Sequence, residues 1–362
     1  MCLKNYSLVF LVLLVILGCR SKTESTTSAP ATDMSLDEIE KIDVHAHFQH
    51  DRDYLPDFLD KWNMQAVLVD VFHEDSTGTA RSFEKYRALA KIHPERFYLC
   101  TAIIGTGIDA PDYADKMIAQ LSDEIDAGAR MVKVWKNFGM VTKDDSGNFI
   151  QIDDPRLQPI WDFLKKEHIP MMAHIGEPLQ AWRKLDPRSP HFGYYTEHPE
   201  YHAFNFPEIP SYETIIAARD HWIESNPDLP ILCAHLGSMS HDVGMVAQRL
   251  DKYPNMYVET AARFGDLARQ DSDVVRSFFI KYQDRILFGS DFGNQSLQET
   301  MTGDEVVAEK SELNFEYDVL WRYLSGKDSL EVKGQMTRGL GLSTEVLKKV
   351  YAQNAVNFMA LD

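Results

Sequence analysis

The feature that most limits the fold of this chain is a regular alternation of short apolar runs with longer amphipathic segments. The runs have the length of β-strands, and the segments between them carry apolar residues at helical spacing. Strands that alternate with helices predict parallel β-α units, and eight such units predict closure into a (β/α)8 TIM barrel. The predicted strands are Lys41–His47, Ala66–Val71, Phe97–Ile103, Arg130–Trp135, Pro170–His174, Pro230–His235, Met256–Thr260 and Ile286–Asp291.

Length and composition agree with a single large domain. The chain has 362 residues, of which 44% are hydrophobic and 25% charged, as in an ordinary globular protein. This length fits one large barrel or two smaller domains, and the eight units favour a barrel over residues 36–362. The predicted helices include Ser82–Ile92, Asp112–Ala127, Arg156–Glu167, Tyr212–Ser225, Asp242–Asp251 and Asp273–Tyr282.

Acidic residues dominate the charge balance, with 55 Asp and Glu against 37 Lys and Arg. The resulting formal charge of −18 repels nucleic acid and anionic lipid surfaces. We therefore expect a small-molecule substrate and no nucleic-acid partner. Homo-oligomerisation stays open.

The first residues are typical of an export signal. Lys4 precedes an apolar run over residues 8–17, which is too short for an ordinary transmembrane helix. Ile16-Leu17-Gly18-Cys19 resembles a bacterial lipobox, in which the cysteine is lipidated and becomes the new amino terminus. We expect a signal peptide over residues 1–18, a membrane anchor on Cys19 and a flexible tether over residues 19–35, in an exported bacterial lipoprotein facing the periplasm or the outside. Simple secretion and an uncleaved anchor are the alternatives.

Two cysteines remain outside this leader, namely Cys100 and Cys233. Both lie in apolar runs, where a free cysteine packs as a small hydrophobe. No disulfide framework is expected.

Two histidines close the first predicted strand. Because side chains alternate along a strand, we expect His45 and His47 to face one way, and Ile42, Val44 and Ala46 to face the other. Two adjacent imidazoles are half of a metal site, although a solvated pair would look the same in the sequence.

Other polar residues end later strands, where active sites of such barrels gather. On the fourth strand, alternation directs Lys133 toward the barrel axis and Val132 and Val134 toward the helices. Core packing alone would not require a polar residue at so many strand ends. The remaining members of this set are His174, His235 and Asp291.

These residues resemble the signatures of the amidohydrolase superfamily, in the family's own order along the chain. Within it, the sequence is most similar to the amidohydrolase-related branch, which includes aromatic-acid decarboxylases, lactonases and other hydrolases. The resemblance implies a metal-dependent hydrolase barrel with one or two divalent ions, commonly zinc. It rests on Asp43-Val44-His45-Ala46-His47, His174-Ile175-Gly176, His235-Leu236-Gly237, Gly289-Ser290-Asp291 and Asn354-Ala355.

Carried over residue by residue, the resemblance implies that His45, His47, His174 and Asp291 bind the metal. His235 would polarise the substrate or assist proton transfer, and Asp291 would also accept a proton from metal-bound water. A bound ion lowers the pKa of water toward about 7, which suits hydrolysis of an amide, lactone or ester.

Lys133 decides the number of metal ions. In binuclear relatives a lysine at this position is carboxylated and bridges two ions, whereas the related branch often keeps the lysine with one. We favour a single ion, most readily zinc. Lys136 is expected to point to solvent.

Substrate choice is expected to depend on loops, above all on the long connection over residues 176–211. It contains Arg183 and Tyr194, which are suited to gripping an aromatic or anionic ligand, although a self-packed surface excursion is the alternative. Glu259 and Arg263, at and after the seventh strand, are further pocket candidates.

Three functions remain open. The first is metal-dependent hydrolysis, and the second is non-oxidative decarboxylation of an aromatic or unsaturated acid on the same scaffold. The third is a binding lipoprotein without turnover, against which the presence of both His235 and Asp291 argues.

Overall fold

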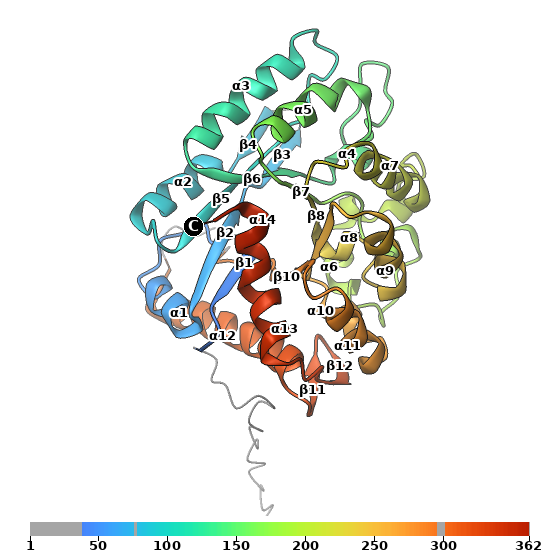
Figure 1. Ribbon diagram of the computed structural model, residues 1–362. Coiled ribbons are helices and arrows are strands. Elements are labelled where there is room, and N and C mark those ends of the chain that lie inside the picture. Colours follow the sequence, from blue (N-terminus) through green and yellow to red (C-terminus); the bar gives the residue numbers. More distant parts are fainter. Residues whose placement is uncertain (1–37, 76–77, 295–300, 362) are drawn as a thin grey trace, which may run out of the picture.

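Eight parallel strands form the centre of the molecule in the computed structural model, which describes residues 38–75, 78–294 and 301–361 (Figure 1). Each strand pairs with the next along the chain, in the order β1-β2-β5-β6-β7-β8-β9-β10. This confirms the predicted barrel. The strands are β1 (Lys41–Ala46), β2 (Met64–Val69), β5 (Phe97–Ala102), β6 (Ala129–Val134), β7 (Met171–Ala173), β8 (Ile231–Cys233), β9 (Met256–Glu259) and β10 (Ile286–Leu287).

Backbone hydrogen bonds connect the first and last strands. Val44 N donates to Phe288 O at 3.0 Å, Asp291 N donates to His45 O at 2.8 Å, and His47 N donates to Phe292 O at 2.7 Å. Residues 45–47 and 291 therefore lie side by side although they are far apart in the sequence.

Helices surround the strands (Figure 1). Side-chain caps start several of them, and the longest has a capping box between Thr302 and Glu305. The six predicted helices are all present, whereas α1 and α12 are additional. The main helices are α1 (Leu55–Trp62), α2 (Phe83–Ile92), α3 (Tyr113–Asp126), α5 (Gln158–Lys166), α7 (Tyr212–Ser225), α9 (Val243–Lys252), α11 (Ser272–Lys281) and α12 (Gly303–Ser325).

Shorter elements fill the connections. Two hairpins pair β3 (Phe72–Asp75) with β4 (Gly78–Arg81) and β11 (Ser329–Val332) with β12 (Gln335–Arg338). The short helices are α4 (Asn137–Met140), α6 (Phe192–Glu197), α8 (Ala234–Gly237), α10 (Phe264–Leu267), α13 (Thr344–Lys348) and α14 (Asn354–Met359), with single turns η2 (Pro155–Leu157), η3 (Leu179–Trp182), η4 (Pro199–Tyr201), η5 (Ala203–Asn205) and η6 (Lys349–Gln353).

Two apolar clusters make the core. The outer cluster lies between strands and helices and includes Val132 and Val134, as predicted. The inner cluster fills the barrel and continues into Phe358 and Met359 of α14. Asn354 of that helix donates to Ile286 O, where β10 begins, so α14 closes the amino-terminal end of the barrel. The opposite end, formed by the carboxyl ends of the strands, is where an active site is expected.

The predicted alternation along β1 is wrong in one respect. Ile42 and Val44 belong to the inner cluster, but Ala46 belongs to the outer one. The pairing of β1 with β2 shifts register between Asp43 and Ala46, which is the mark of a β-bulge. The extra residue lets Val44 and His45 both turn inward, with Asp43 directed toward α12.

Cys100 and Cys233 are buried and free, so the described residues contain no disulfide, as expected. The expected signal peptide, the lipidated Cys19 and the tether over residues 19–35 lie outside the described residues. Within the described ranges, no helix has the length and apolar character needed to cross a membrane.

Candidate metal centre

Three of the four predicted metal ligands converge at the carboxyl ends of β1 and β10. Asp291 Oδ1 lies 3.0 Å from His47 Nε2 and 3.5 Å from His45 Nε2. One ligand atom from each residue lies within 4.8 Å of the others. The imidazoles are buried, whereas the Asp291 side chain keeps 32% of its surface exposed and can meet a substrate.

Glycines make this close approach possible. A Cβ on Gly289 would lie 2.6 Å from Glu259 Oε2 and 3.1 Å from His45 Cβ. A Cβ on Gly293 would lie 2.0 Å from the carbonyl oxygen of His47. Since real Cβ atoms do not approach so closely, the two residues that flank Ser290 to Phe292 must be glycines here.

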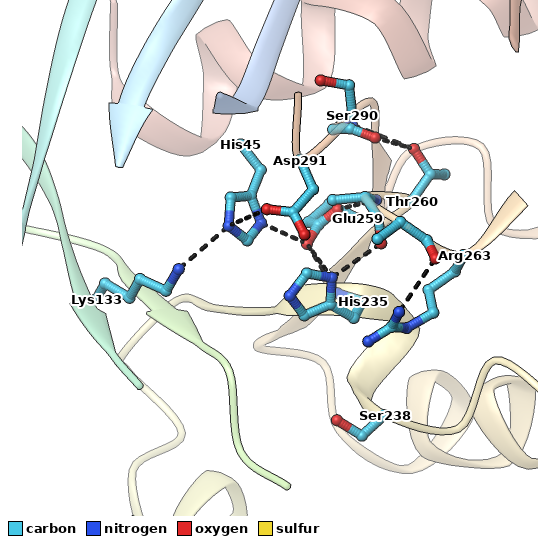
Figure 2. Close-up of polar contacts among 12 residues, drawn as sticks. His45, Lys133, His235, Ser238, Glu259, Thr260, Arg263, Ser290 and Asp291 are labelled. Atoms are coloured by element: carbon cyan, nitrogen blue, oxygen red, sulfur yellow. Dashed lines mark hydrogen bonds and ion pairs between the residues drawn. The ribbon is translucent and has the colours of Figure 1, made fainter. Parts of the chain in front are cut away.

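Glu259 lies at the centre of the cluster (Figure 2). Its Oε1 accepts from His45 Nδ1 at 3.0 Å and from His235 N at 2.7 Å, and Oε2 accepts from Ala261 N. With Nδ1 donating, His45 keeps the lone pair of Nε2 for a metal, and the carboxylate fixes the ring's orientation. Glu259, His45 and His235 form a second group of ligand atoms within 4.8 Å.

His235 adopts an unusual backbone conformation. Its φ is +58°, and Leu236 and Ser238 also lie in the left-handed region, which costs about 1 kcal/mol or more for each such residue. The bond from His235 N to Glu259 helps to hold this turn. His235 Nδ1 donates to Ala261 O at 2.9 Å, so Nε2 of the neutral ring is an acceptor.

Burial sets the protonation states. It lowers the pKa of His45 and His174 well below their usual range, and that of His235 to about 3. Burial alone would raise the pKa of Asp291, but His45 and His47 outweigh it and lower that pKa well below 3.8. Neutral imidazoles and an ionised carboxylate are the forms that bind a divalent ion.

His174 is the fourth predicted ligand. Its ring packs against His235 with a centroid separation of 4.3 Å, and its buried Nε2 has no hydrogen-bond partner within the part of the chain that the structure describes. An unpaired buried nitrogen beside a cluster of ligand atoms is what a metal ligand would leave in the free protein. The residues therefore fit a divalent ion.

Lys133 enters the same cluster from β6. Its Nζ lies 3.1 Å from His45 Nε2, and burial lowers the pKa of the ammonium group (Figure 2). The ammonium group of Lys133 thus lies within hydrogen-bonding distance of a candidate metal ligand.

A family model described as amidohydrolase matches residues 42–359. The chain belongs to the amidohydrolase family. It is therefore an enzyme of the amidohydrolase superfamily, which sets aside the non-catalytic alternative. Metal dependence is a property of this superfamily, and the ligand groups described above agree with it. No curated protein matches the sequence of this amidohydrolase significantly.

Solved structures with the same fold have low sequence identity. An uncharacterised TIM-barrel protein, Bb4693 from Bordetella bronchiseptica, is 15% identical (TM-score 0.53; 89% of this chain and 99% of the other covered). The 2,6-dihydroxybenzoate decarboxylase from Rhizobium is 14% identical (0.52; 90% and 99%). The dihydroxybenzoic acid decarboxylase from Polaromonas sp. JS666, with bound manganese and the inhibitor 2-nitroresorcinol, is 15% identical (0.50; 89% and 97%). At these identities the likeness shows the fold alone.

A pocket of about 260 Å³ opens beside the metal centre of this amidohydrolase. Its floor includes His174, His235 and Asp291, and the connection between β7 and α7 contributes Tyr194 and His191. The remaining lining residues are Lys136, Glu177, Pro190, Ala262, Arg263, Gly265, Ser290, Phe292 and Lys333.

The candidate substrate residues divide between two places. Tyr194 and Arg263 line the pocket, whereas Arg183 lines a separate hollow with Lys184, Arg188 and Arg269. Arg183 follows η3 in an extended conformation, and its carbonyl accepts from His202 Nε2 at 2.9 Å, so its backbone is held within the long connection.

The expectation that Lys136 points to solvent is wrong. Lys136 is buried, pairs with Glu177, donates to Tyr194 Oη at 3.1 Å and lies 3.6 Å from the ring centroid of Tyr201. β6 ends at Val134, so strand alternation does not predict the direction of the Lys136 side chain. It connects the barrel mouth to the long connection over residues 176–211.

Asp43 belongs to the first motif of the sequence, and its hydrogen bonds give it a positioning role. Its carboxylate accepts from the backbone N of His45 and of Ser290, at 3.1 and 3.0 Å. It also accepts from Ser290 Oγ at 2.5 Å and from Tyr317 Oη of α12 at 2.6 Å. Asp43 thus holds the candidate ligands of β1 next to the loop that contains Ser290 and Asp291. A carboxylate inside an apolar strand was the available signal.

Proposed function

We propose that this amidohydrolase is a metal-dependent hydrolase that acts with one divalent ion, preferably zinc, on an amide, lactone or ester of a small molecule. The ligands would be His45, His47, His174 and Asp291. The observation that carries this proposal is the convergence of ligand atoms from His45, His47 and Asp291, with the partly exposed Asp291 carboxylate lining the adjacent pocket.

When bound, such an ion supplies a Lewis acid and a nucleophilic water at neutral pH. Asp291 is suited to accept the proton of the attacking water, because its carboxylate is ionised and faces the pocket. His235 is suited to proton transfer rather than to hydrogen-bond donation, because Nδ1 is committed to Ala261 O and Nε2 is free to accept. Lys133 would be carboxylated only in a binuclear form.

Metal analysis tests the proposal directly. Purified protein should contain about one divalent ion per chain, and the double variant His45→Ala, His47→Ala should contain almost none. His93→Ala, which removes a histidine outside the pocket, is the matched control. Hydrolysis of a panel of lactones, esters and amides should stop with a chelator and return when zinc is added back. Wild-type protein without any divalent ion would overturn the proposal.

Decarboxylation is the second candidate. It is supported by Arg263 in the pocket, which could hold a substrate carboxylate, and two of the structures with the same fold bear the names of decarboxylases. Release of carbon dioxide from aromatic acids, together with no hydrolysis of esters or amides, would favour decarboxylation over hydrolysis.

We also propose that the enzyme is exported and anchored through a lipid on Cys19. Cells that express the full chain should retain it in the membrane fraction, and Cys19→Ser should move it to the soluble fraction, with Cys2→Ser as the control. A wild-type chain that is already soluble would contradict the anchor. Light scattering of the detergent-extracted protein would determine whether it forms homo-oligomers.

A further inference from the structure

We infer that Ser238 is a positioning residue, which fixes the placement of His235 relative to His174 by joining the turn of His235 to both ends of the long connection over residues 176–211. This inference rests on the proposed function, because it concerns two residues to which that function gives roles. It is carried by a strained turn and by the hydrogen bonds that hold it.

The turn that carries His235 consists of four consecutive residues with positive φ, of which Ser238 is the last (Figure 2). The φ angles are +58° for His235, +54° for Leu236, +63° for Gly237 and +59° for Ser238. Glycine adopts this region readily, whereas the other three residues are held there against their preference. The turn therefore depends on support from its surroundings.

Ser238 provides this support with two different groups, and it is fully buried. Its Oγ lies 3.0 Å from Ile175 O and 2.9 Å from Gly176 O, so one hydroxyl hydrogen is shared between two carbonyl groups. Its own carbonyl accepts from Tyr212 Oη at 2.9 Å. Ile175 and Gly176 directly follow His174, and Tyr212 begins α7. Ser238 thus bonds to the chain where the long connection begins and where it has ended.

The ends of the long connection are also held close to each other. Trp182 Nε1 donates to Pro210 O at 2.9 Å, and the Trp182 ring packs edge-on against the Tyr212 ring with a centroid separation of 5.5 Å. Arg219 of α7 is fully buried and donates to Gly237 O. The long connection and α7 therefore form a frame against which the turn is fixed.

This frame sets the placement of the two histidines beyond the ends of their strands. β7 and β8 are paired as far as Ala173 and Cys233, so strand pairing stops before either histidine. The two rings pack with a centroid separation of 4.3 Å, yet no hydrogen bond joins these side chains in the part of the chain that the structure describes. Their relative position must come from the backbone, and Ser238 joins the two backbone segments. Displacements of about 1 Å are enough to impair a site of this kind.

Ser238→Ala and Ser238→Gly test the inference together, because both remove the hydroxyl but only glycine also relieves the strained φ. Ser238→Gly should therefore keep a Tm closer to that of wild type. In metal-free protein with 13C-labelled histidine, the ring proton shifts of His174 and His235 should move in both variants. Ser325→Ala, which removes a buried hydroxyl bonded to Trp321 O, is the control and should leave them unchanged.

The same variants should impair the loaded enzyme. Competition with a chelator should show zinc affinity weakened by about 10-fold or more, since His174 would be displaced. For the panel substrate that wild type hydrolyses fastest, kcat should fall by on the order of 10-fold while KM stays nearly unchanged, since His235 would be displaced.

Tyr212→Phe removes the bond to the carbonyl of Ser238 and should lower kcat in the same direction. The losses in the double variant Tyr212→Phe, Ser238→Ala should be smaller than the product of the single losses, because both bonds act on one residue. Tyr282→Phe, which removes a hydroxyl bonded to Ala247 O, is the control.

Histidine ring shifts that stay unchanged in both Ser238 variants would overturn the inference, even if the Tm falls, because Ser238 would then be only structural. Restored ring shifts in Ser238→Gly would also overturn it, because the effect would come from backbone strain rather than from the hydroxyl. Wild-type protein that binds no zinc would contradict the proposed function alone, since the ring shifts are measured without metal or turnover.

Discussion

At the scale of single residues, the candidate ligands could be found in the sequence because each one ends a predicted strand. Strand periodicity and the rule that active sites lie at the carboxyl ends of barrel strands predict that these residues lie close together. That His45, His47, His174 and Asp291 bind the metal is implied by the family resemblance and stays a prediction. The partners of these ligands were harder to find. His45 meets Glu259 across 214 positions, and no local pattern relates two residues so far apart.

Glu259→Gln should weaken metal binding by about 10- to 100-fold while the fold is kept. The carboxylate accepts three hydrogen bonds from His45, His235 and Ala261, and an amide would turn a donor toward at least one of these donors. Competition with a chromophoric chelator measures the affinity, and circular dichroism checks the fold. Unchanged affinity would show that Glu259 does not orient His45.

At the scale of elements, strand positions were predicted within a few residues because buried parallel strands are short apolar runs. The bulge in β1 could not be predicted, since an extra residue leaves the composition of a strand unchanged. The path of the connection over residues 176–211 could not be predicted from the sequence either. Two buried polar contacts pin it, one from Lys136 to Glu177 and one from His191 to Asp266.

Asp266→Asn should loosen this connection. Burial alone would raise the pKa of Asp266, but the contact with His191 outweighs it and holds the pKa below 3.8. A lowered pKa contributes stability that is present above 3.8 and lost as the pH falls through the lower value of the folded state.

The free energy of unfolding in urea should therefore differ between wild type and Asp266→Asn by about 1.5–3 kcal/mol at pH 7. The difference should shrink as the pH falls below 3.8. Asp228→Asn, at an exposed position, is the control. A difference that grows in acid would contradict the assigned charge of Asp266.

At the scale of the whole molecule, the residues that stabilise the barrel and the residues of the candidate site lie at opposite ends. The inner cluster and α14 close one end, and the metal centre occupies the other. The resemblance included Asn354-Ala355 without a reason for it, and the structure supplies one. Asn354 donates to Gln283 O and Ile286 O at 2.7 Å each, which ties the last helix to the start of β10.

Asn354→Leu should lower stability without altering the site. It leaves two carbonyl groups without their donor, at a cost of about 1–3 kcal/mol. The Tm should fall, while metal content and kcat/KM per folded molecule should match wild type. A loss of metal at temperatures well below the Tm would show that the two ends of the barrel are coupled.

The hydrogen bonds of Asp43 have a consequence for the order of events during synthesis. Tyr317 lies 274 positions after Asp43 and Asp291 lies 244 positions after His47, so the strand that leaves the ribosome among the first is completed among the last. Until then β1 has neither its closing neighbour nor the groups that hydrogen-bond to its polar side chains. Such late closure is slow and exposes an unpaired edge, so a nascent chain of this protein is expected to need chaperone protection until α12 has emerged.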